Sequence, residues 1–161
     1  MKQKLVVGAA TAAAIYIAAP LIELVEGVEN KPYMDIAGVK TVCAGVTGPD
    51  VVWGKTYSNR ECRMLLEKHI QIHGKHVQSA VTYPISPETR AALISFSYNV
   101  GGRAMRKSTA VRLINQGKVE RGCKALGLWN KATVNGKKVV VKGLVNRRSE
   151  EIKLCLSGLQ R

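Results

Sequence analysis

The first 22 residues constrain the fold more than any other part of the chain. Residues 5–22 carry no charged side chain, and only Lys2 and Lys4 precede them. Eighteen such residues are just long enough to cross a bilayer as a helix, but seven of them are alanine, so the segment should insert weakly. The lysines favour a cytoplasmic N-terminus. We therefore expect residues 1–22 to enter the inner membrane and everything after Ile22 to be exported.

Three fates are open to this segment: cleavage as a signal peptide, permanent anchoring, or insertion followed by release. Cleavage is disfavoured because no small-x-small site follows a full apolar core. Residues 10–12 come too early, and residues 17–19 begin with a bulky isoleucine. The remaining residues, 23–161, have the size of one domain, and no linker, repeat or low-complexity stretch divides them. We expect that domain to be a monomer.

Two carboxylates follow the uncharged segment. Glu26 lies near the end of a predicted helix, in the stretch LIELVEGVEN, and Asp35 lies nine residues later on a predicted hairpin, YMDIAGVKTVCAGVTG. Apolar Leu24, Val25 and Val28 would desolvate Glu26 and keep it protonated, as a general acid requires. The exposed Asp35 would stay ionised. Such a pair suits cleavage of a glycosidic bond, which needs a proton donor and a carboxylate that activates water or attacks directly.

Thr41 lies six residues beyond Asp35, on the return strand of the hairpin. Its hydroxyl could both donate to and accept from a water held against that carboxylate. Spacing alone leaves an alternative open, because two carboxylates nine residues apart occur by chance in most chains of this size. On that basis Glu26 and Asp35 could equally be two solvated surface acids.

The stretch from Glu26 to Thr41 resembles the motif of the phage lysozyme family, in which a Glu, eight residues, an Asp, five residues and a Thr follow one another. Further blocks look like successive segments of the lambdoid-phage endolysins in that family: EGVENKPYMDIAGVKTVCAGVTG, GKTYSNREC, RAALISFSYNVG, KSTAVRLINQGK and GLVNRRSEE. Together they cover nearly all of residues 23–155. At one position the chain departs from the family: Val46 follows Gly45, where members often carry a His, which puts local packing in doubt more than chemistry.

The resemblance implies a muramidase that hydrolyses the β-1,4 bond between N-acetylmuramic acid and N-acetylglucosamine in peptidoglycan, by an inverting single displacement. Glu26 would be the general acid, Asp35 the general base, and Thr41 would position the water; no cofactor is implied. The endolysins that the chain resembles include signal-anchor-release members with Ala- and Gly-rich segments like residues 1–22. We therefore expect a phage or prophage endolysin that is inactive while tethered and is then released to the periplasm for host lysis.

Two other functions stay open. A lytic transglycosylase needs one catalytic Glu, consumes no water and leaves a 1,6-anhydro sugar end, so Asp35 and Thr41 would be dispensable. A basic exported protein that only binds wall glycan or damages membranes would keep its activity after Glu26→Gln.

Four cysteines on the exported side predict disulfides, because such bonds persist there. They are Cys43, Cys62, Cys123 and Cys155. Of the three possible connectivities, we favour Cys43 with Cys62 and Cys123 with Cys155, because each pair keeps to one half of the chain. Buried free thiols are the alternative. The spacing of the cysteines matches no zinc motif.

The formal charge of +14 predicts a polyanionic partner. Peptidoglycan, with its peptide carboxylates, fits an exported protein, whereas nucleic acid does not. We interpret the basic runs at 103–107, 137–138 and 147–148 as solvated surface, with contact to the substrate as the alternative. Three histidines at positions 69, 73 and 76 share a helix face, but no nearby acid or cysteine completes a metal site, so we expect no metal.

The remaining pattern predicts a mainly helical α+β protein with a small antiparallel β-sheet lobe near the carboxylates and a helical lobe, consistent with the two-lobed phage-type lysozyme fold. Ser58 and Glu61 form a capping box at the start of one helix, and Asn135-Gly136 indicates a tight hairpin. Helices are expected over residues 58–77, 86–101, 109–116, 120–126 and about 147–156.

Overall fold

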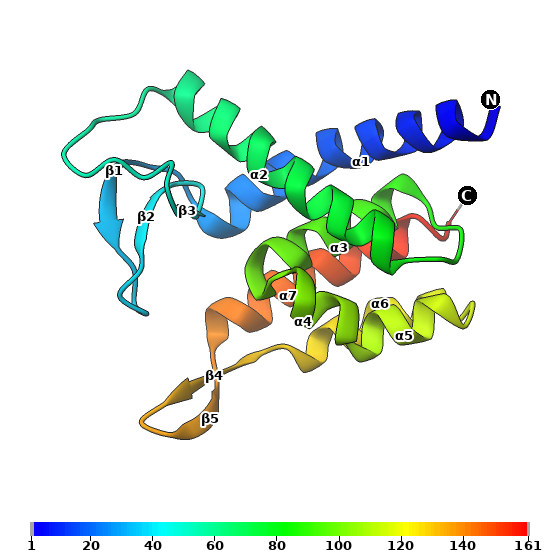
Figure 1. The fold of residues 1–161 in the computed structure, drawn as a ribbon. Helices are drawn as coiled ribbons and strands as arrows, with labels where there is room; N and C mark the ends of the chain where they lie inside the picture. Colours follow the sequence, from blue (N-terminus) through cyan, green and yellow to red (C-terminus); the bar gives the residue numbers. More distant parts are fainter. Residues whose placement is uncertain (1, 161) are drawn as a thin grey trace.

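The computed structural model describes residues 2–160, with side chains from residue 11 onward. Helices form the body of the molecule, and two small antiparallel sheets project from one side of it (Figure 1). The helices are α1 (Lys2–Glu26), α2 (Asn59–Ala80), α3 (Pro87–Val100), α4 (Gly102–Lys107), α5 (Thr109–Asn115), α6 (Val119–Ala125), the 3-10 helix η1 (Leu126–Leu128) and α7 (Lys142–Ser157). The strands are β1 (Glu29–Met34), β2 (Lys40–Cys43), β3 (Val46–Thr47), β4 (Lys131–Val134) and β5 (Lys137–Val140). The predicted fold class, mainly helical with small antiparallel sheets, is confirmed.

Helix α3 lies at the centre of the helical lobe and packs against α1, α2 and α7. The second half of α1 contributes to this core through Ala14, Ala18 and Ile22, which are fully buried. These positions are four residues apart and so lie on one face of the helix. Residues 14–22 of the uncharged N-terminal segment are therefore, in this structure, part of the packed helical lobe. Among the described residues, no helix combines the length and the hydropathy that crossing a bilayer would need.

The β1–β3 lobe is a three-stranded antiparallel sheet in the order β1-β2-β3. Its own small core consists of Val42, Cys43, Val46, Tyr57 and Cys62. A disulfide between Cys43 and Cys62 joins β2 to α2, and so ties this lobe to the helical lobe. The departure from the family pattern is accommodated here, since Val46 is fully buried in that core.

A second disulfide, between Cys123 and Cys155, joins α6 to α7 inside the helical core. Both predicted cysteine pairings are thus confirmed. The two bonds act on different interfaces, one between the lobes and one within the helical lobe.

The local signals in the sequence predict several element ends correctly. The capping box of Ser58 and Glu61 begins α2, Ser86 caps α3, and Gly101 ends it. The hairpin of β4 and β5 turns at Asn135 and Gly136, which both have positive φ values of 48° and 77°. Helix α2 runs three residues beyond its predicted end, to Ala80.

Two predictions about the helices were wrong. Helix α7 begins at Lys142, about five residues before its predicted start, because Val141 precedes it without a side-chain cap that the sequence could have revealed. Helix α4 was not predicted, because Gly101-Gly102 indicates a stop rather than the start of a new helix. The early start of α7 is the more consequential error, since Arg147 and Arg148 lie within this helix rather than at its start, and both are buried.

Candidate active site

Glu26 is the last residue of α1, and Gly27 ends that helix with a positive φ of 70°. The Glu26 side chain is 24% exposed and forms an ion pair through Oε1 with Nη1 of Arg147 on α7. The expectation that Leu24 and Val28 desolvate Glu26 is wrong, because both side chains are themselves exposed. The group that lies against the carboxylate is a guanidinium.

Arg147 is only 5% exposed and has a fixed orientation. Its Nε donates to Oε1 of Glu151 at 3.2 Å and its Nη2 to the carbonyl of Ser95 at 3.1 Å. The fully buried Glu151 also accepts from the Ser95 hydroxyl at 2.8 Å and pairs with Arg148. Burial raises the pKa of Glu151, while the two guanidiniums oppose that rise. The prediction that residues 147–148 form a solvated face is therefore wrong; they belong to a buried polar network that ends at Glu26.

The turn between β2 and β3 lies directly against Glu26. Gly45 has a φ of 74°, and a Cβ added there would be 3.0 Å from both Cδ and Oε2 of Glu26. The Tyr98 hydroxyl of α3 donates to the carbonyl of Ala44 at 2.7 Å and so joins this turn to the helical lobe. Burial raises the pKa of Tyr98, and the charge of Glu26 raises it further. Glu26 therefore sits where the two lobes meet.

Asp35 lies directly after β1, at the start of the turn into β2. Its Oδ1 accepts hydrogen bonds from the backbone N–H groups of Ala37 at 2.9 Å and Val39 at 2.8 Å, which fix the carboxylate against the turn. Its Oδ2 accepts no hydrogen bond within the part of the chain that the structure describes. One oxygen is therefore structural, and the other is free to take a ligand.

Thr41 lies on β2, opposite Tyr33 of β1 and Thr47 of β3. Its side chain is almost fully buried, and its hydroxyl donates to the carbonyl of Val39 at 3.0 Å. Val39 also donates its N–H to Asp35, so Thr41 and Asp35 are bound to the same residue. The structure thus places Thr41 on the return strand beside Asp35, as the sequence predicted.

Tyr33 of β1 lies within electrostatic range of both carboxylates. Burial raises the pKa of its phenol, and the charges of Glu26, Asp35 and Glu29 raise it further, in that order. A groove of about 440 Å³ runs beside it, between the end of α1 and β1. Its lining residues are Glu26, Gly27, Val28, Glu29, Lys31, Pro32 and Tyr33. Glu26 therefore lines this groove, whereas neither Asp35 nor Thr41 is among its lining residues.

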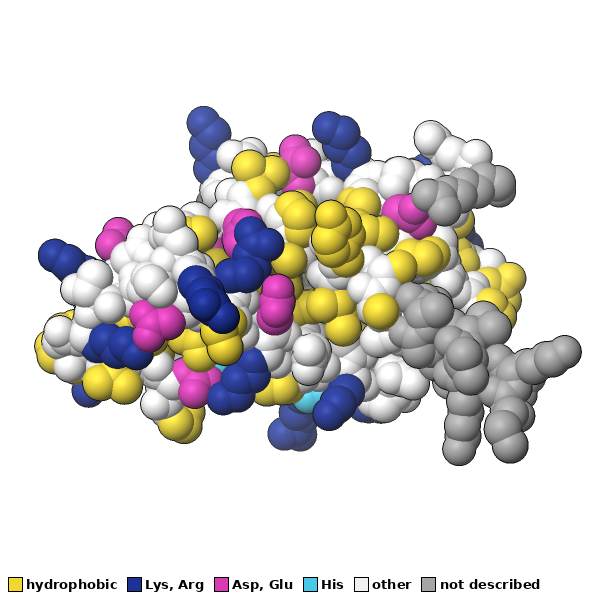
Figure 2. All heavy atoms as spheres, turned by 90° about the horizontal axis from the view of Figure 1, so that it is seen from above, with side chains coloured by type: hydrophobic (Ala, Val, Ile, Leu, Met, Phe, Trp, Pro, Cys, Tyr) yellow, Lys and Arg dark blue, Asp and Glu magenta, His cyan; other side chains and the backbone are white. Residues whose placement is uncertain are grey.

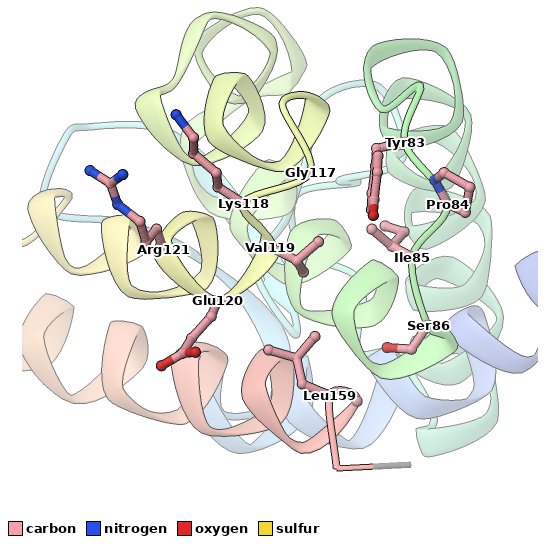
Figure 3. Close-up of a pocket in the computed structure, with 11 residues that line it drawn as sticks. Tyr83, Pro84, Ile85, Ser86, Gly117, Lys118, Val119, Glu120, Arg121 and Leu159 are labelled. Atoms are coloured by element: carbon pink, nitrogen blue, oxygen red, sulfur yellow. The ribbon is translucent and has the colours of Figure 1, made fainter.

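A larger hollow of about 570 Å³ lies away from these residues. Figure 3 shows it between the loop at Tyr83–Ser86, the turn at Gly117 and the end of α7 near Leu159. These segments lie at the end of the helical lobe opposite β1–β3 (Figure 1). None of the predicted catalytic residues lines it, so its greater size does not make it the candidate active site.

The three histidines of α2 have separate environments. His69 Nε2 lies 3.1 Å from Oδ2 of Asp50, which lies 19 residues earlier in the chain. That carboxylate is shared with Lys68, and the hydrogen bond from Lys68, followed by that from His69, lowers the pKa of Asp50. His73 instead bonds the Ser97 hydroxyl at 2.8 Å through Nδ1. Within the described residues, no group of three potential ligands is arranged to hold a metal ion.

Known proteins match the chain along most of its length. The Phage lysozyme family model matches residues 23–151. The SAR-endolysin of Pseudomonas phage phiKMV is 46% identical over 149 residues, which cover 92% of this chain and 89% of that protein. Among solved structures, the endolysin from Escherichia coli O157:H7 phage FAHEc1 superposes with a TM-score of 0.82 at 32% identity, over 86% of this chain and 90% of that one. The active form of P1 phage endolysin Lyz gives a TM-score of 0.76 at 27% identity, over 88% and 84% of the two chains.

Three site features could not be read from the sequence: Arg147, Gly45 and Tyr98. Arg147 stood out only as part of a basic pair, and nothing local indicates that it meets Glu26. In the sequence, Gly45 is marked only by Val46, which follows it where family members often carry a His. The family match and the identity to phage endolysins nevertheless extend over most of the chain. The chain belongs to the phage lysozyme family.

Proposed function

We propose that the protein is a signal-anchor-release endolysin that hydrolyses the β-1,4 bond between N-acetylmuramic acid and N-acetylglucosamine in peptidoglycan. The observation that carries this proposal is the position of Glu26: it ends α1, pairs with a buried arginine, and lines a groove beside β1. A carboxyl group on one side of a sugar and a carboxylate on the other are the groups that glycoside hydrolysis needs.

In the proposed reaction, Glu26 donates a proton to the leaving oxygen while a water attacks the anomeric carbon from the opposite face. The Thr41 hydroxyl donates its hydrogen bond to the Val39 carbonyl, so its oxygen is available to accept a hydrogen bond from that water. The second proton of the water is taken by Oδ2 of Asp35, whose Oδ1 is already held by two backbone N–H groups. The attacking oxygen is thereby oriented without a covalent enzyme intermediate.

Arg147 has a positioning role in this scheme. It touches neither the water nor the leaving group, but it fixes the Glu26 carboxyl through a guanidinium that Glu151 and Ser95 hold in place. Glu26 must be protonated to act, so each cycle requires the ion pair with Arg147 to give way to a hydrogen bond from the neutral carboxyl group to substrate. The glycosidic oxygen of a bound substrate supplies the acceptor for that hydrogen bond.

The N-terminal segment supplies the proposed control. Residues 1–22 would first hold the enzyme in the inner membrane, with residues 23–161 as the catalytic domain on the periplasmic side. Ala14, Ala18 and Ile22 belong to the core of the helical lobe, so that core is complete only when the segment has left the membrane. Glu26 is the last residue of the same helix, and its position therefore depends on how the segment is placed.

The exposed surface of α1 is consistent with such a transfer. Its solvent-facing residues after position 11 include Tyr16 and Leu24, with 83% and 70% exposure, and the segment up to Ile22 carries no charge after Lys4. Figure 2, which looks onto α1 and α2, shows hydrophobic side chains exposed among scattered basic ones. A helix with this composition can be accommodated both at the protein surface and, weakly, in a bilayer. Loss of the membrane potential would then release it to the periplasm, where we propose that the monomer acts.

Analysis of the glycan ends tests the proposed chemistry. Purified peptidoglycan is digested with the intact protein and with Glu26→Gln, and the soluble products are identified by mass spectrometry. A muramidase releases reducing muramic ends, and the variant releases none. Anhydro ends would identify a transglycosylase, and lysis that survives in Glu26→Gln would identify a wall-binding or membrane-active protein.

A further inference from the structure

The hairpin of β4 and β5 is an exposed, basic element to which the proposed reaction gives no role. Seven of its eight strand residues are exposed, and the eighth, Ala132, is only partly buried. It carries Lys131, Lys137 and Lys138, and Lys142 follows it at the start of α7. Residues 121–149 contain no acidic side chain. In the part of the chain whose side chains are described, none of these four ammonium groups forms a salt bridge or a hydrogen bond.

The register of the hairpin determines which face each lysine occupies. Its register pairs Lys131 with Val140 and Thr133 with Lys138, and a two-residue turn closes it. Cross-strand partners lie on the same face of a sheet, so Lys131 and Lys138 share one face, while Lys137 lies on the other beside Val134. An exposed two-stranded hairpin buries little apolar surface and gains little stability alone.

The base of the hairpin is close to Glu26. Val141 closes it by donating its N–H to the carbonyl of Asn130, and α7 begins at the next residue. Arg147, which binds Glu26, lies five residues into α7, so about 7.5 Å of helix separates the two points. In Figure 1 the β4–β5 hairpin and the β1–β2 hairpin project from the same side of the helical body. A polymer lying across Glu26 would therefore pass beside these lysines.

We propose that the β4–β5 hairpin binds the carboxylates of the peptide stems that peptidoglycan carries on its muramic acid residues. This inference rests on the proposed function and names the part of the substrate that the hairpin recognises. The glycan itself is neutral along most of its length, whereas the stems bear carboxylates at regular intervals. An acid-free basic hairpin beside the proposed site of cleavage has the complementary charge, and the unpaired ammonium groups are free to bind those carboxylates.

The expected effect is moderate and depends on salt. Exposed ion pairs contribute little individually, so the loss of three lysines should lower kcat/KM on intact peptidoglycan by about tenfold. The contribution should decline as ionic strength increases, because the contacts are solvent-exposed. A substrate without stems should not respond to the hairpin charges at all.

The test compares two triple variants on two substrates. The hairpin variant changes Lys131, Lys137 and Lys138 to Gln. One substrate is intact peptidoglycan, and the other is glycan strands from which an amidase has removed the stems and in which the lactyl carboxylates so exposed have been converted to amides. We expect the hairpin variant to lose about tenfold in kcat/KM on intact peptidoglycan, to equal the unmodified protein on stem-free glycan, and to lose the salt dependence of its activity.

The matched control removes the same amount of charge elsewhere. Lys118, Arg121 and Lys153 are exposed, and the first two line the hollow far from β1–β3. Changing these three residues to Gln should leave both activities unchanged. An equal loss in the control variant would mean that net charge, and not the hairpin, is responsible, and would overturn the proposal.

Three further outcomes would also overturn it: an equal loss of the hairpin variant on both substrates, no loss on either, or lost binding to anionic vesicles with full activity on intact peptidoglycan. Failure of the proposed function gives a different result, since the unmodified protein would then release no reducing muramic ends from either substrate. In that case, a binding measurement still decides whether the hairpin binds the stems. The Glu26→Gln protein is co-sedimented with peptidoglycan and compared with a Glu26→Gln protein that also carries the hairpin substitutions.

Discussion

The carboxylate of Glu26 accepts a hydrogen bond from Arg147, 121 residues further along the chain. The contact joins the end of α1 to α7, and so connects the first and last helices of the fold at the candidate active site. Through Arg147 it extends to Glu151 and Ser95, which are both fully buried. The position of the proposed catalytic acid is therefore set by the packing of the helical lobe.

Replacing Arg147 tests this positioning role. Arg147→Gln should lower kcat by about 100-fold with little change in KM, because a misplaced acid impairs the chemical step more than substrate binding. It should also cost about 3 kcal/mol of unfolding free energy, since Glu151 loses one of its partners in the core. Arg147→Lys should recover part of kcat. An unchanged kcat in folded Arg147→Gln protein would show that the contact does not position Glu26.

Gly45 provides a second test of the geometry around Glu26. Ala at this position would place a methyl group 3.0 Å from the Glu26 carboxyl carbon, and the φ of 74° disfavours any side chain. We expect Gly45→Ala to lose about 1–2 kcal/mol of stability and at least tenfold in kcat, as displacement of a catalytic group predicts. Steady-state kinetics and urea unfolding measure the two effects.

Gly48 is the matched control for this substitution. Its φ is 87°, but nothing lies within 4 Å of an added Cβ. Gly48→Ala should therefore show a similar loss of stability with normal kcat. If both variants lost activity to the same extent, backbone strain in the β lobe, and not contact with Glu26, would be the cause.

The disulfide between Cys43 and Cys62 should stabilise the junction of the two lobes. It closes a loop with a sequence separation of 19, for which chain entropy predicts about 3 kcal/mol. The double variant Cys43→Ala/Cys62→Ala should lose that amount in urea unfolding, and a reductant should lower the stability of the unmodified protein. A reductant that leaves unfolding unchanged would contradict this account of the lobe junction.

Partly buried His73 predicts a loss of stability in mild acid. Burial, followed by the charges of His76 and His69, lowers its pKa from 6.5 to about 4. Between these values the unfolded chain binds a proton that the folded protein does not, so stability is present above pH 6.5 and is lost as pH falls toward 4. After allowance for partial exposure, the loss should be about 2 kcal/mol.

His73→Asn isolates this contribution. Asn can keep a hydrogen bond to the Ser97 hydroxyl, which His73 contacts in the structure, but it does not titrate. Its unfolding free energy should therefore change less between pH 7 and pH 4 than that of the unmodified protein. Parallel pH profiles for the two proteins would contradict the assignment to His73.

The sequence predicted the parts of the fold that depend on local signals. Caps at Ser58 and Ser86, the turn at Asn135 and the return strand with Thr41 each follow from residues within a few positions of one another. Both disulfide pairings were also found, because each joins elements within one half of the chain.

The environment of Glu26 could not be predicted in the same way. The local pattern placed apolar neighbours around it, whereas long-range packing brings Arg147 there instead. For the same reason, Arg147 and Arg148 were wrongly predicted to lie at the surface. Both pair with Glu151, and this group of side chains is buried only once α3 packs over it. Contacts between side chains more than a hundred residues apart in the sequence cannot be predicted from local spacing.

The stereochemistry of the cut tests the central claim most directly. Chitin-like or muramic oligosaccharides are cleaved in an NMR tube, and the anomer of the new reducing end is read before it equilibrates. If Asp35 activates a water while Glu26 protonates the leaving oxygen, the first product is the α-anomer, formed by inversion at a β-linked carbon. An initial β-anomer, or a 1,6-anhydro end with no added water, would contradict the single displacement assigned to Glu26, Asp35 and Thr41.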